Sequence, residues 1–266
     1  MVADAAHLAG LIGAYLRAHV RRILEYRANF FIGLFAIMSR HVINLAALAV
    51  IFFHTPGLGD WSPYEVVYLY GYVALIVAVW HLLFANTLRV EFLVRDAGFD
   101  RYLVRPLPPL LQLLFYYFDD DAIGDFIPAI ACLAVASSQL QIVYTWDVVL
   151  LFGLGLAGGV LVHFGIHLLL SAWSFWFIRS RALINLFSEV RRFSEYPLSI
   201  FPMSLQWLFT LVVPIAFAGF YPAERLLSVT TLSLLAWLAL PLGLVTCGIG
   251  AAVWHAGLAR YQSAGS

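Results

Sequence analysis

Lysine is absent from this chain of 266 residues, and all 15 of its basic residues are arginine. The phosphate-binding loop of P-loop ATPases requires a lysine that contacts the β- and γ-phosphates. The chain is therefore not a conventional P-loop ATPase. If it takes part in ATP-driven work, the motor is another polypeptide.

Charge and cysteine are also scarce. Charged residues make up 11% of the chain, against roughly 25% in soluble domains, whereas hydrophobic residues make up 63%. The formal net charge is zero, so nothing favours a nucleic-acid partner. Cys132 and Cys247 both lie in apolar stretches, and their number and spacing exclude a disulfide framework and a zinc ribbon. This composition predicts an all-α integral membrane protein.

Apolar stretches long enough to cross a bilayer as helices, about 20 residues each, recur along the chain. They are Phe30–Phe53, Tyr64–Leu88, Ile123–Leu140, Val148–Phe177 and Leu226–Leu258. Between the last two stretches, either Ala182–Phe201 or Met203–Tyr221 can supply a further span. The first candidate carries charges, and the second has Pro214 at its middle. We predict a single membrane domain over residues 1–266 with about six transmembrane helices.

The N-terminal segment has an amphipathic pattern. Its apolar residues between Leu8 and Leu24 recur at helical spacing, and Arg17, Arg21 and Glu25 line another face. This pattern is typical of a helix that lies in the membrane interface, which we place within residues 1–28. An ordinary helix packed against other protein segments is the alternative.

The arginines indicate the orientation of the chain. They gather before the first span, in residues 89–121, after the fourth span and after the last span. The loops 54–63 and 141–147 contain none. Because positively charged loops stay in the cytoplasm, we expect both termini and the polar segment 89–121 to be cytoplasmic.

A short helix is expected within this polar segment, at about Pro108–Phe118. The sequence RPLPP at residues 105–109 is a rigid, non-helical lead-in, because each proline fixes its own φ and biases the preceding residue away from the α conformation. The following LLQLLFYYF can form about two helical turns. A short helix across the cytoplasmic ends of the spans suits a transporter that is driven by a soluble motor.

Aspartates follow this helix, and they allow two interpretations. Asp121 and Asp125 form one Asp-x-x-x-Asp pair, and Asp96 and Asp100 form another. Membrane prenyltransferases bind magnesium diphosphate with aspartate-rich loops, because Mg²⁺ prefers oxygen ligands. Alternatively, the aspartates are a solvated part of the loop, and Asp121 and Asp125 cap the third span.

Ionisable residues also lie inside the expected spans. Arg40, with His41 and Asn44 nearby, lies about ten residues into the first span, where an arginine costs about 3 kcal/mol on insertion scales. It can line a transport path, pair with Glu189 or Glu195, or extend toward the cytoplasm. If residues 182–201 cross the membrane, Arg191 and Arg192 need partners such as the same two glutamates. His163 and His167 are one helical turn apart without a third metal ligand near in sequence, so we expect packed histidines.

Two segments carry a resemblance to a known family: FDRYLVRPLPPLLQLLFYYFDDDAIGDF and RRFSEYPLSIFPMSLQWLFTLVVPIAFAGFYPAERLL. With the expected spans, they resemble the permease subunit of bacterial ABC transporters of the type-2 exporter class. The resemblance favours residues 182–201 as the fifth span and residues 203–222 as a re-entrant hairpin before the last one. The hairpin's broken backbone would have to be covered by protein.

The resemblance implies a non-catalytic half-transporter in the bacterial plasma membrane. It would form an export path with a second permease chain, identical or a sister, while separate ABC ATPase subunits bind ATP and Mg²⁺. The candidate residues of the coupling loop, 89–121, and its edge are Asp100, Arg105, Pro106, Pro108, Gln112, Asp119, Asp121 and Asp125. The candidates for the path or for intramembrane pairing are Arg40, Glu189, Arg191 and Arg192. The alternatives are a magnesium-dependent prenyltransferase-like enzyme and a non-catalytic membrane scaffold.

Overall fold

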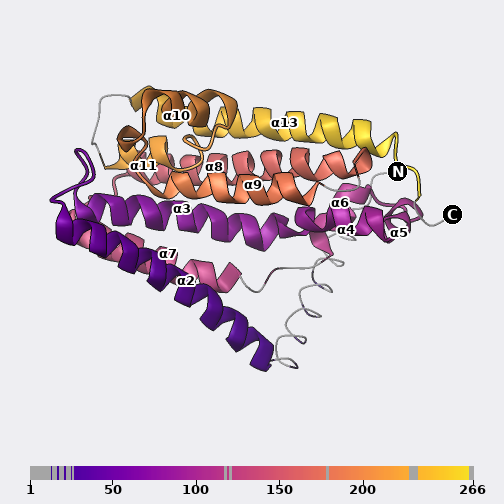
Figure 1. Cartoon of the computed structure of the whole chain (residues 1–266), viewed down its shortest axis with the longest axis horizontal. Helices are drawn as coiled ribbons and strands as arrows, with labels where there is room; N and C mark the ends of the chain where they lie inside the picture. The colour runs from indigo at the N-terminus through magenta and orange to yellow at the C-terminus, as the bar shows by residue number, and fades with distance from the viewer. Residues whose placement is uncertain are drawn as a thin grey trace.

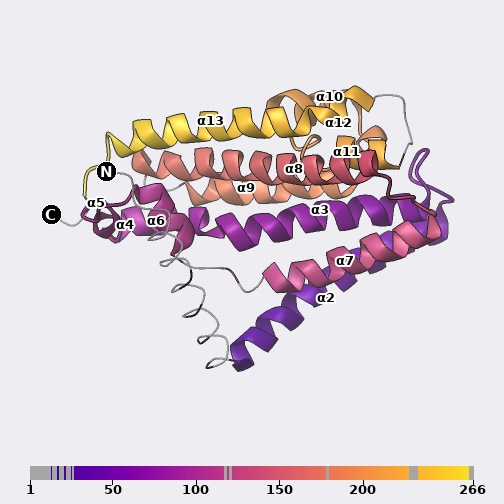
Figure 2. The same cartoon turned by 180° about the vertical axis from the view of Figure 1, so that it is seen from behind.

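The computed structural model describes residues 13, 17, 21, 25, 27–116, 119, 122–177, 180–227 and 233–263. These residues form helices joined by short turns (Figures 1 and 2). Within them, β-type pairing is limited to a bridge between Leu58 and Trp61. The predicted interfacial helix of residues 1–28 falls almost wholly outside the described residues.

Five helical stretches of the described residues are long and apolar enough to cross a membrane. Four of them confirm predicted spans, and the fifth covers only the second part of the predicted last span. They are α2 (Arg27–His54), α3 (Pro63–Phe84) extended by η1 (Ala85–Arg89) and α4 (Val90–Arg95), α7 (Ala122–Gln139), α8 (Trp146–Ala172) extended by η2 (Trp173–Phe175), and α13 (Ala239–Leu258). The start of α3 is fixed locally, because Pro63 suits the first helical turn and the Ser62 amide donates to the Glu65 carboxylate over 2.7 Å.

Helices α8 and α13 pack closely because glycines face each other across their contact. A Cβ atom at Gly250 would lie 2.6 Å from the carbonyl oxygen of Gly165, and one at Gly243 would lie 2.7 Å from that of Gly158. Small residues allow this close approach of two helix backbones. In contrast, α2 and α7 run together and diverge from the other long helices toward one end of the molecule (Figures 1 and 2).

The segment of residues 182–201, expected as one crossing, is a broken helix. Helix α9 (Arg181–Arg191) leads into η3 (Arg192–Glu195) and η4 (Leu198–Ile200). Pro197 and Pro202 explain the break, because a proline biases the residue before it away from the α conformation. The expected fifth span is therefore a short helix, alongside α8 (Figure 1), followed by 3-10 turns.

Residues 203–222 form a bent hairpin. Its first arm is α10 (Met203–Trp207) with the π-helical η5 (Leu208–Val212), and its second arm starts with α11 (Phe220–Leu226). The hydroxyl groups of Thr210 and Tyr221 are 2.9 Å apart and join the arms. The bend contains Pro214, as the sequence predicted.

The last apolar stretch is not one span from Leu226 to Leu258. Helix α12 (Ser233–Trp237) ends at a turn before α13 begins at Ala239. Pro241 lacks the N–H that would bond the carbonyl group of Trp237, which explains an interruption at this point.

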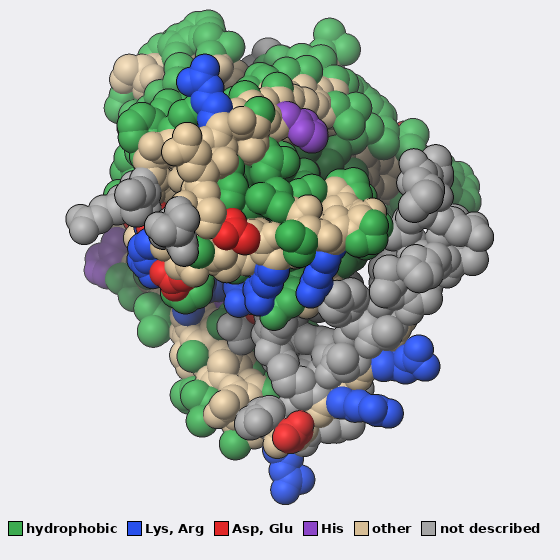
Figure 3. All heavy atoms as spheres, turned by 90° about the vertical axis from the view of Figure 1, so that its right-hand side faces the viewer, with side chains coloured by type: hydrophobic (Ala, Val, Ile, Leu, Met, Phe, Trp, Pro, Cys, Tyr) green, Lys and Arg blue, Asp and Glu red, His purple; other side chains and the backbone are tan. Residues whose placement is uncertain are grey.

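The polar segment forms a block of short helices at the end of the molecule where α13 also ends (Figure 1). It contains α4, α5 (Asp100–Leu103) and α6 (Pro109–Phe115). Helix α6 confirms the short helix expected at about Pro108–Phe118, although residues 117 and 118 are not described. Figure 3 looks onto this end, where arginine and acidic side chains gather among apolar ones.

Candidate functional site

A buried carboxylate joins three of the long helices. Asp125 of α7 accepts hydrogen bonds at Oδ1 from Arg40 Nη2 over 2.6 Å and from His41 Nε2 over 2.8 Å, both from α2. Its other oxygen, Oδ2, is 2.9 Å from His81 Nδ1 of α3. The side chain of Asp125 is 2% exposed. These residues, with Tyr70, are called the Asp125 cluster below.

The Asp125 cluster corrects two sequence interpretations. Asp125 is not part of the coupling loop, because it lies inside α7 and bonds to side chains of α2 and α3. Arg40 bonds to Asp125 and not to Glu189 or Glu195. Sequence spacing does not reveal the contact between Arg40 and Asp125, because it does not show which face of α7 turns toward α2.

Three charged residues of α9 and η3 line a small cavity beside the Asp125 cluster: Arg191, Arg192 and Glu195. Arg192 Nε is 3.4 Å from Glu189 Oε2, and Arg191 Nη1 is 4.0 Å from Glu195 Oε1. The two arginines therefore have the glutamate partners that the sequence suggested. A cavity of about 30 Å³ separates this group from the Asp125 cluster, room for about one water molecule. Its lining residues are Arg40, His41, Asn44, Tyr70, Ala74, Val77, Asp125, Arg191, Arg192 and Glu195.

His163 and His167 are packed in the protein interior next to Trp80. The imidazole of His167 stacks on the Trp80 ring with centroids 4.0 Å apart, and its Nδ1 is 2.8 Å from the carbonyl oxygen of His163. Among the described residues, no group of three or more histidine, cysteine or acidic side chains could hold a metal ion.

The coupling loop is held together by a buried glutamine. Gln112 of α6 donates from Nε2 to the backbone carbonyl of Tyr102 over 2.9 Å and to that of Leu107. Its side chain faces the loop interior. Arg105, Pro106 and Pro108 are exposed beside it.

A second set of contacts fastens this loop to the chain after α13. The Tyr261 hydroxyl donates to Asp100 Oδ1 over 2.8 Å, and the Ser263 hydroxyl donates to Oδ2 over 2.5 Å. The ring centroids of Tyr261 and Phe99 are 5.3 Å apart, and those of Phe99 and Trp254 of α13 are 6.0 Å apart. Burial raises the pKa of Tyr261 to about 12, and its hydrogen bond to Asp100 acts in the same direction.

The aspartates that were expected to form two pairs contact different partners. Asp96 pairs with the neighbouring Arg95, Asp100 binds Tyr261 and Ser263, and Asp125 belongs to the cluster described above. Asp119 is half-buried, and Asp121 lies outside the described residues. This arrangement of the described aspartates does not favour a shared magnesium-diphosphate site.

Arginines and a tyrosine form the exposed rim of the loop. The guanidinium carbons of Arg89 and Arg101 lie 5.5 Å and 5.1 Å from the centre of the Tyr116 ring. The apolar Val104 is 85% exposed nearby in sequence. An exposed apolar residue among stacked arginines is typical of a protein contact surface.

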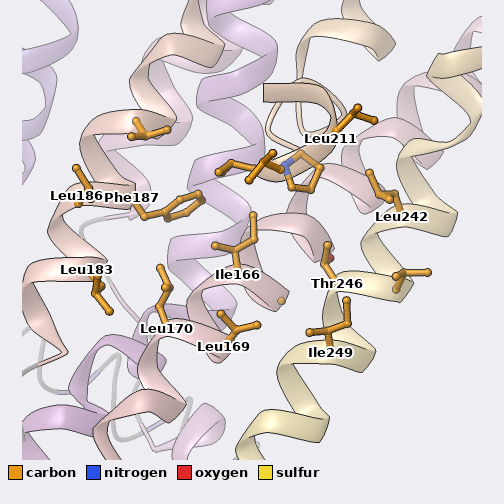
Figure 4. Close-up of a pocket in the computed structure, with 16 residues that line it drawn as sticks. Ile166, Leu169, Leu170, Leu183, Leu186, Phe187, Leu211, Leu242, Thr246 and Ile249 are labelled. Atoms are coloured by element: carbon orange, nitrogen blue, oxygen red, sulfur yellow. The ribbon is translucent and has the colours of Figure 1, made fainter. Parts of the chain in front are cut away.

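An apolar cavity of about 460 Å³ lies between α8, α9, the first hairpin arm and α13 (Figure 4). Leucine, isoleucine and valine side chains line most of it, together with Phe187, Pro214, Gly165 and Thr246. Such a lining accommodates apolar groups such as acyl chains.

A comparison with protein-family models matches residues 38–265 to the ABC-2 family transporter protein. The chain belongs to this family. The match covers the five long helices, the coupling loop and the hairpin, apart from the first eleven residues of α2. Searches of curated proteins and of solved structures found no match. The chain is thus a multi-pass membrane protein and an ABC transporter permease, as the sequence resemblance implied.

Proposed function

We propose that the chain is the membrane-spanning half of an ATP-driven exporter in the bacterial plasma membrane. It works with separate ABC ATPase subunits, and a second permease chain, identical or a sister, completes the path. The observation that carries this proposal is the coupling loop. Its short helix α6 is braced by Gln112 and by the Asp100–Tyr261 contact at the arginine-rich end of the molecule.

This bracing suits a surface that receives force from a motor. A loop without internal contacts would deform under load, whereas α6 is fixed to α5 through Gln112. The loop is fixed in turn to α13 through Phe99 and Trp254, and to the C-terminal segment through Tyr261. A displacement of the loop therefore moves the ends of the long helices with it. The arginine distribution supports a cytoplasmic position for this end and for both termini.

The transport path is expected along the face shared by α2, α3 and α9. Charged side chains at this face are partly exposed: Arg40 by 42%, Arg192 by 51% and Glu189 by 69%. Because a charge facing lipid is costly, such groups face protein or a water-filled space. A second permease chain that covers this face would provide protein contacts for these charges and would enclose a water-filled space between the two chains. The hairpin of residues 203–222 is then expected to enter from the outer side.

Purification of the tagged full-length chain from native membranes tests this function. We expect an ABC ATPase subunit and ATP hydrolysis to accompany the wild-type chain, whereas the chain alone hydrolyses no ATP. Glycine substitution of residues 105–109 is expected to abolish the association, because it removes the rigid lead-in to α6. The same change at residues 141–144, on the opposite side, is the control. ATP turnover by the isolated chain, or loss of the association in the control alone, would contradict the proposal.

A further inference from the structure

The hydrogen bonds of the Asp125 cluster define the protonation state of His41. The short contact with Arg40 shows that Asp125 is an ionised acceptor, so the His41 nitrogen that faces it carries a proton. His41 Nδ1 then accepts from the Tyr70 hydroxyl, 2.6 Å away, and Tyr70 is 2% exposed. A second proton on His41 would reverse this bond, because Nδ1 would then donate and the Tyr70 hydroxyl would have to accept.

His81 differs from His41 in this respect. Its Nδ1 donates to Asp125, and its Nε2 makes no hydrogen bond within the described part of the chain. The side chain is 25% exposed, so Nε2 can accept a proton without losing a contact. Protonation would convert the hydrogen bond to Asp125 into an ion pair, which is the stronger interaction.

We propose that His81 and Asp125 form a proton-binding site that locks α7 against α3. This inference concerns the chain itself and does not rest on the proposed transport function. The proton binds at His81 Nε2 and adds one positive charge beside the ionised Asp125. No bond other than the new N–H is made or broken.

The charges around the pair determine how strongly it holds the proton. From α2, Arg40 opposes a further positive charge, and His41 shares the Asp125 carboxylate. From α9 and η3, Arg191 and Arg192 oppose the charge and Glu195 favours it, across the small cavity. From α8, the neutral His163 and His167 lie behind Trp80. Asp125 is the one acidic group in direct contact with His81 among the described residues, and it stabilises the imidazolium.

The position of the pair explains what it would lock. Helices α2 and α7 diverge from α3 toward the coupling-loop end (Figures 1 and 2). Asp125 lies in the first turn of α7, and His81 lies in the last turn of α3. Farther along α7, the contact with α3 is tight, since a Cβ atom at Gly71 would lie 2.8 Å from Cys132 Cβ. The His81–Asp125 pair thus holds the end of α7 at which the helices separate.

The first experiment measures the proton directly. The full-length chain, labelled with ¹⁵N-histidine in lipid nanodiscs, is examined by NMR between pH 8 and pH 5.5, where imidazole groups can change charge. The His81 signal is identified as the one that is missing from the spectrum of His81→Asn. We expect it to change from the neutral to the imidazolium form as the pH falls. The asparagine amide reproduces the Nδ1–H donor, so this variant keeps the bond to Asp125; His81→Gln is the second variant for assignment. A His81 signal that stays unchanged over this range overturns the proposal.

The second experiment measures the lock. We expect the thermal unfolding midpoint of the wild-type chain to rise by about 3 °C from pH 8 to pH 6, because protonation of His81 turns its hydrogen bond to Asp125 into an ion pair. His81→Asn should lose this rise. His54→Gln, at the far end of α2 and bonded to its own helix at the Val50 carbonyl, should keep it. An equal rise in wild type and His81→Asn would show that proton binding does not lock α7.

Discussion

Arg40 Nη2 lies 2.6 Å from Asp125 Oδ1, although 85 positions separate the two residues in the sequence. The carboxylate is buried, whereas the arginine side chain is 42% exposed on the face proposed for the path. One ion pair therefore joins the interior of the helix bundle to that face. Because the Asp125 carboxylate is buried and needs its charged partner, the pair fixes the rotation of α2 relative to α7.

We predict that Asp125→Asn destabilises the chain by about 1.5–3 kcal/mol, because it removes the charged acceptor that Arg40 and the two imidazoles share. Arg40→Gln should have a similar effect, since it leaves Asp125 with the two imidazoles alone. In the double variant, the two effects should be less than additive, because neither charge is then left unpaired. The measurement is the free energy of unfolding in detergent micelles.

Arg95→Gln is the control for this cycle. Arg95 pairs with Asp96 over 3.1 Å, and both side chains are about half exposed. An exposed pair contributes about 0–1 kcal/mol. Strictly additive effects of the Arg40 and Asp125 variants would mean that this contact does not hold the two helices together.

The order of the spans could be predicted because each span reflects a local property. A run of about 20 apolar residues is visible without its neighbours, and α2, α3, α7 and α8 begin within three residues of the predicted positions. The same holds for α6, since RPLPP fixes its start. The broken helix after Arg191 was missed because the span at residues 182–201 was placed by the family resemblance, whereas Pro197 interrupts the helix there.

The Asp125 cluster could not be predicted, because its contacts depend on helix rotation. Asp125 comes shortly after three consecutive aspartates, so the sequence pattern placed it at the edge of a polar loop. His81 lies in an apolar stretch and gives no motif. One signal was available: Arg40, His41 and Asn44 fall on one side of the first span at helical spacing. This spacing indicates that α2 meets a polar partner, but not which one.

The contact between α8 and α13 gives a second prediction. Gly250→Ala should destabilise the chain by about 1–3 kcal/mol, because the new methyl group would lie 2.6 Å from the Gly165 carbonyl oxygen. Gly248→Ala is the matched control, since no atom lies within 4 Å of its added Cβ. We expect that control to be neutral or slightly stabilising. Equal unfolding midpoints for both variants would show that the close packing of α8 and α13 contributes little.

The orientation gives a third prediction, tested with cysteines in a background without Cys132 and Cys247. Val143, in the loop before α8, and Val104, in the coupling loop, are 73% and 85% exposed. We expect Val143→Cys to react with an impermeant thiol reagent in intact cells. Val104→Cys should react only after permeabilisation. Labelling of Val104→Cys in intact cells would reverse the assigned sides.

The contact between Tyr261 and Asp100 gives the last prediction. Tyr261→Phe keeps the ring packed on Phe99 and removes the hydroxyl donor, so it should cost about 1.5–3 kcal/mol, as expected for a hydrogen bond to a charged group. Tyr64→Phe, in the first turn of α3, changes an exposed tyrosine and should have little effect.

The pH dependence identifies the Tyr261 contribution. In the folded chain the pKa of Tyr261 is raised to about 12, whereas an unfolded tyrosine ionises near pH 10. The stabilising contribution of the protonated phenol is therefore complete below about pH 10 and is lost as the pH rises toward 12. The wild-type chain should lose more stability between pH 9 and pH 11 than Tyr261→Phe does, measured as free energy of unfolding. If both lose the same amount, the Tyr261 hydroxyl does not hold the C-terminal segment on the coupling loop.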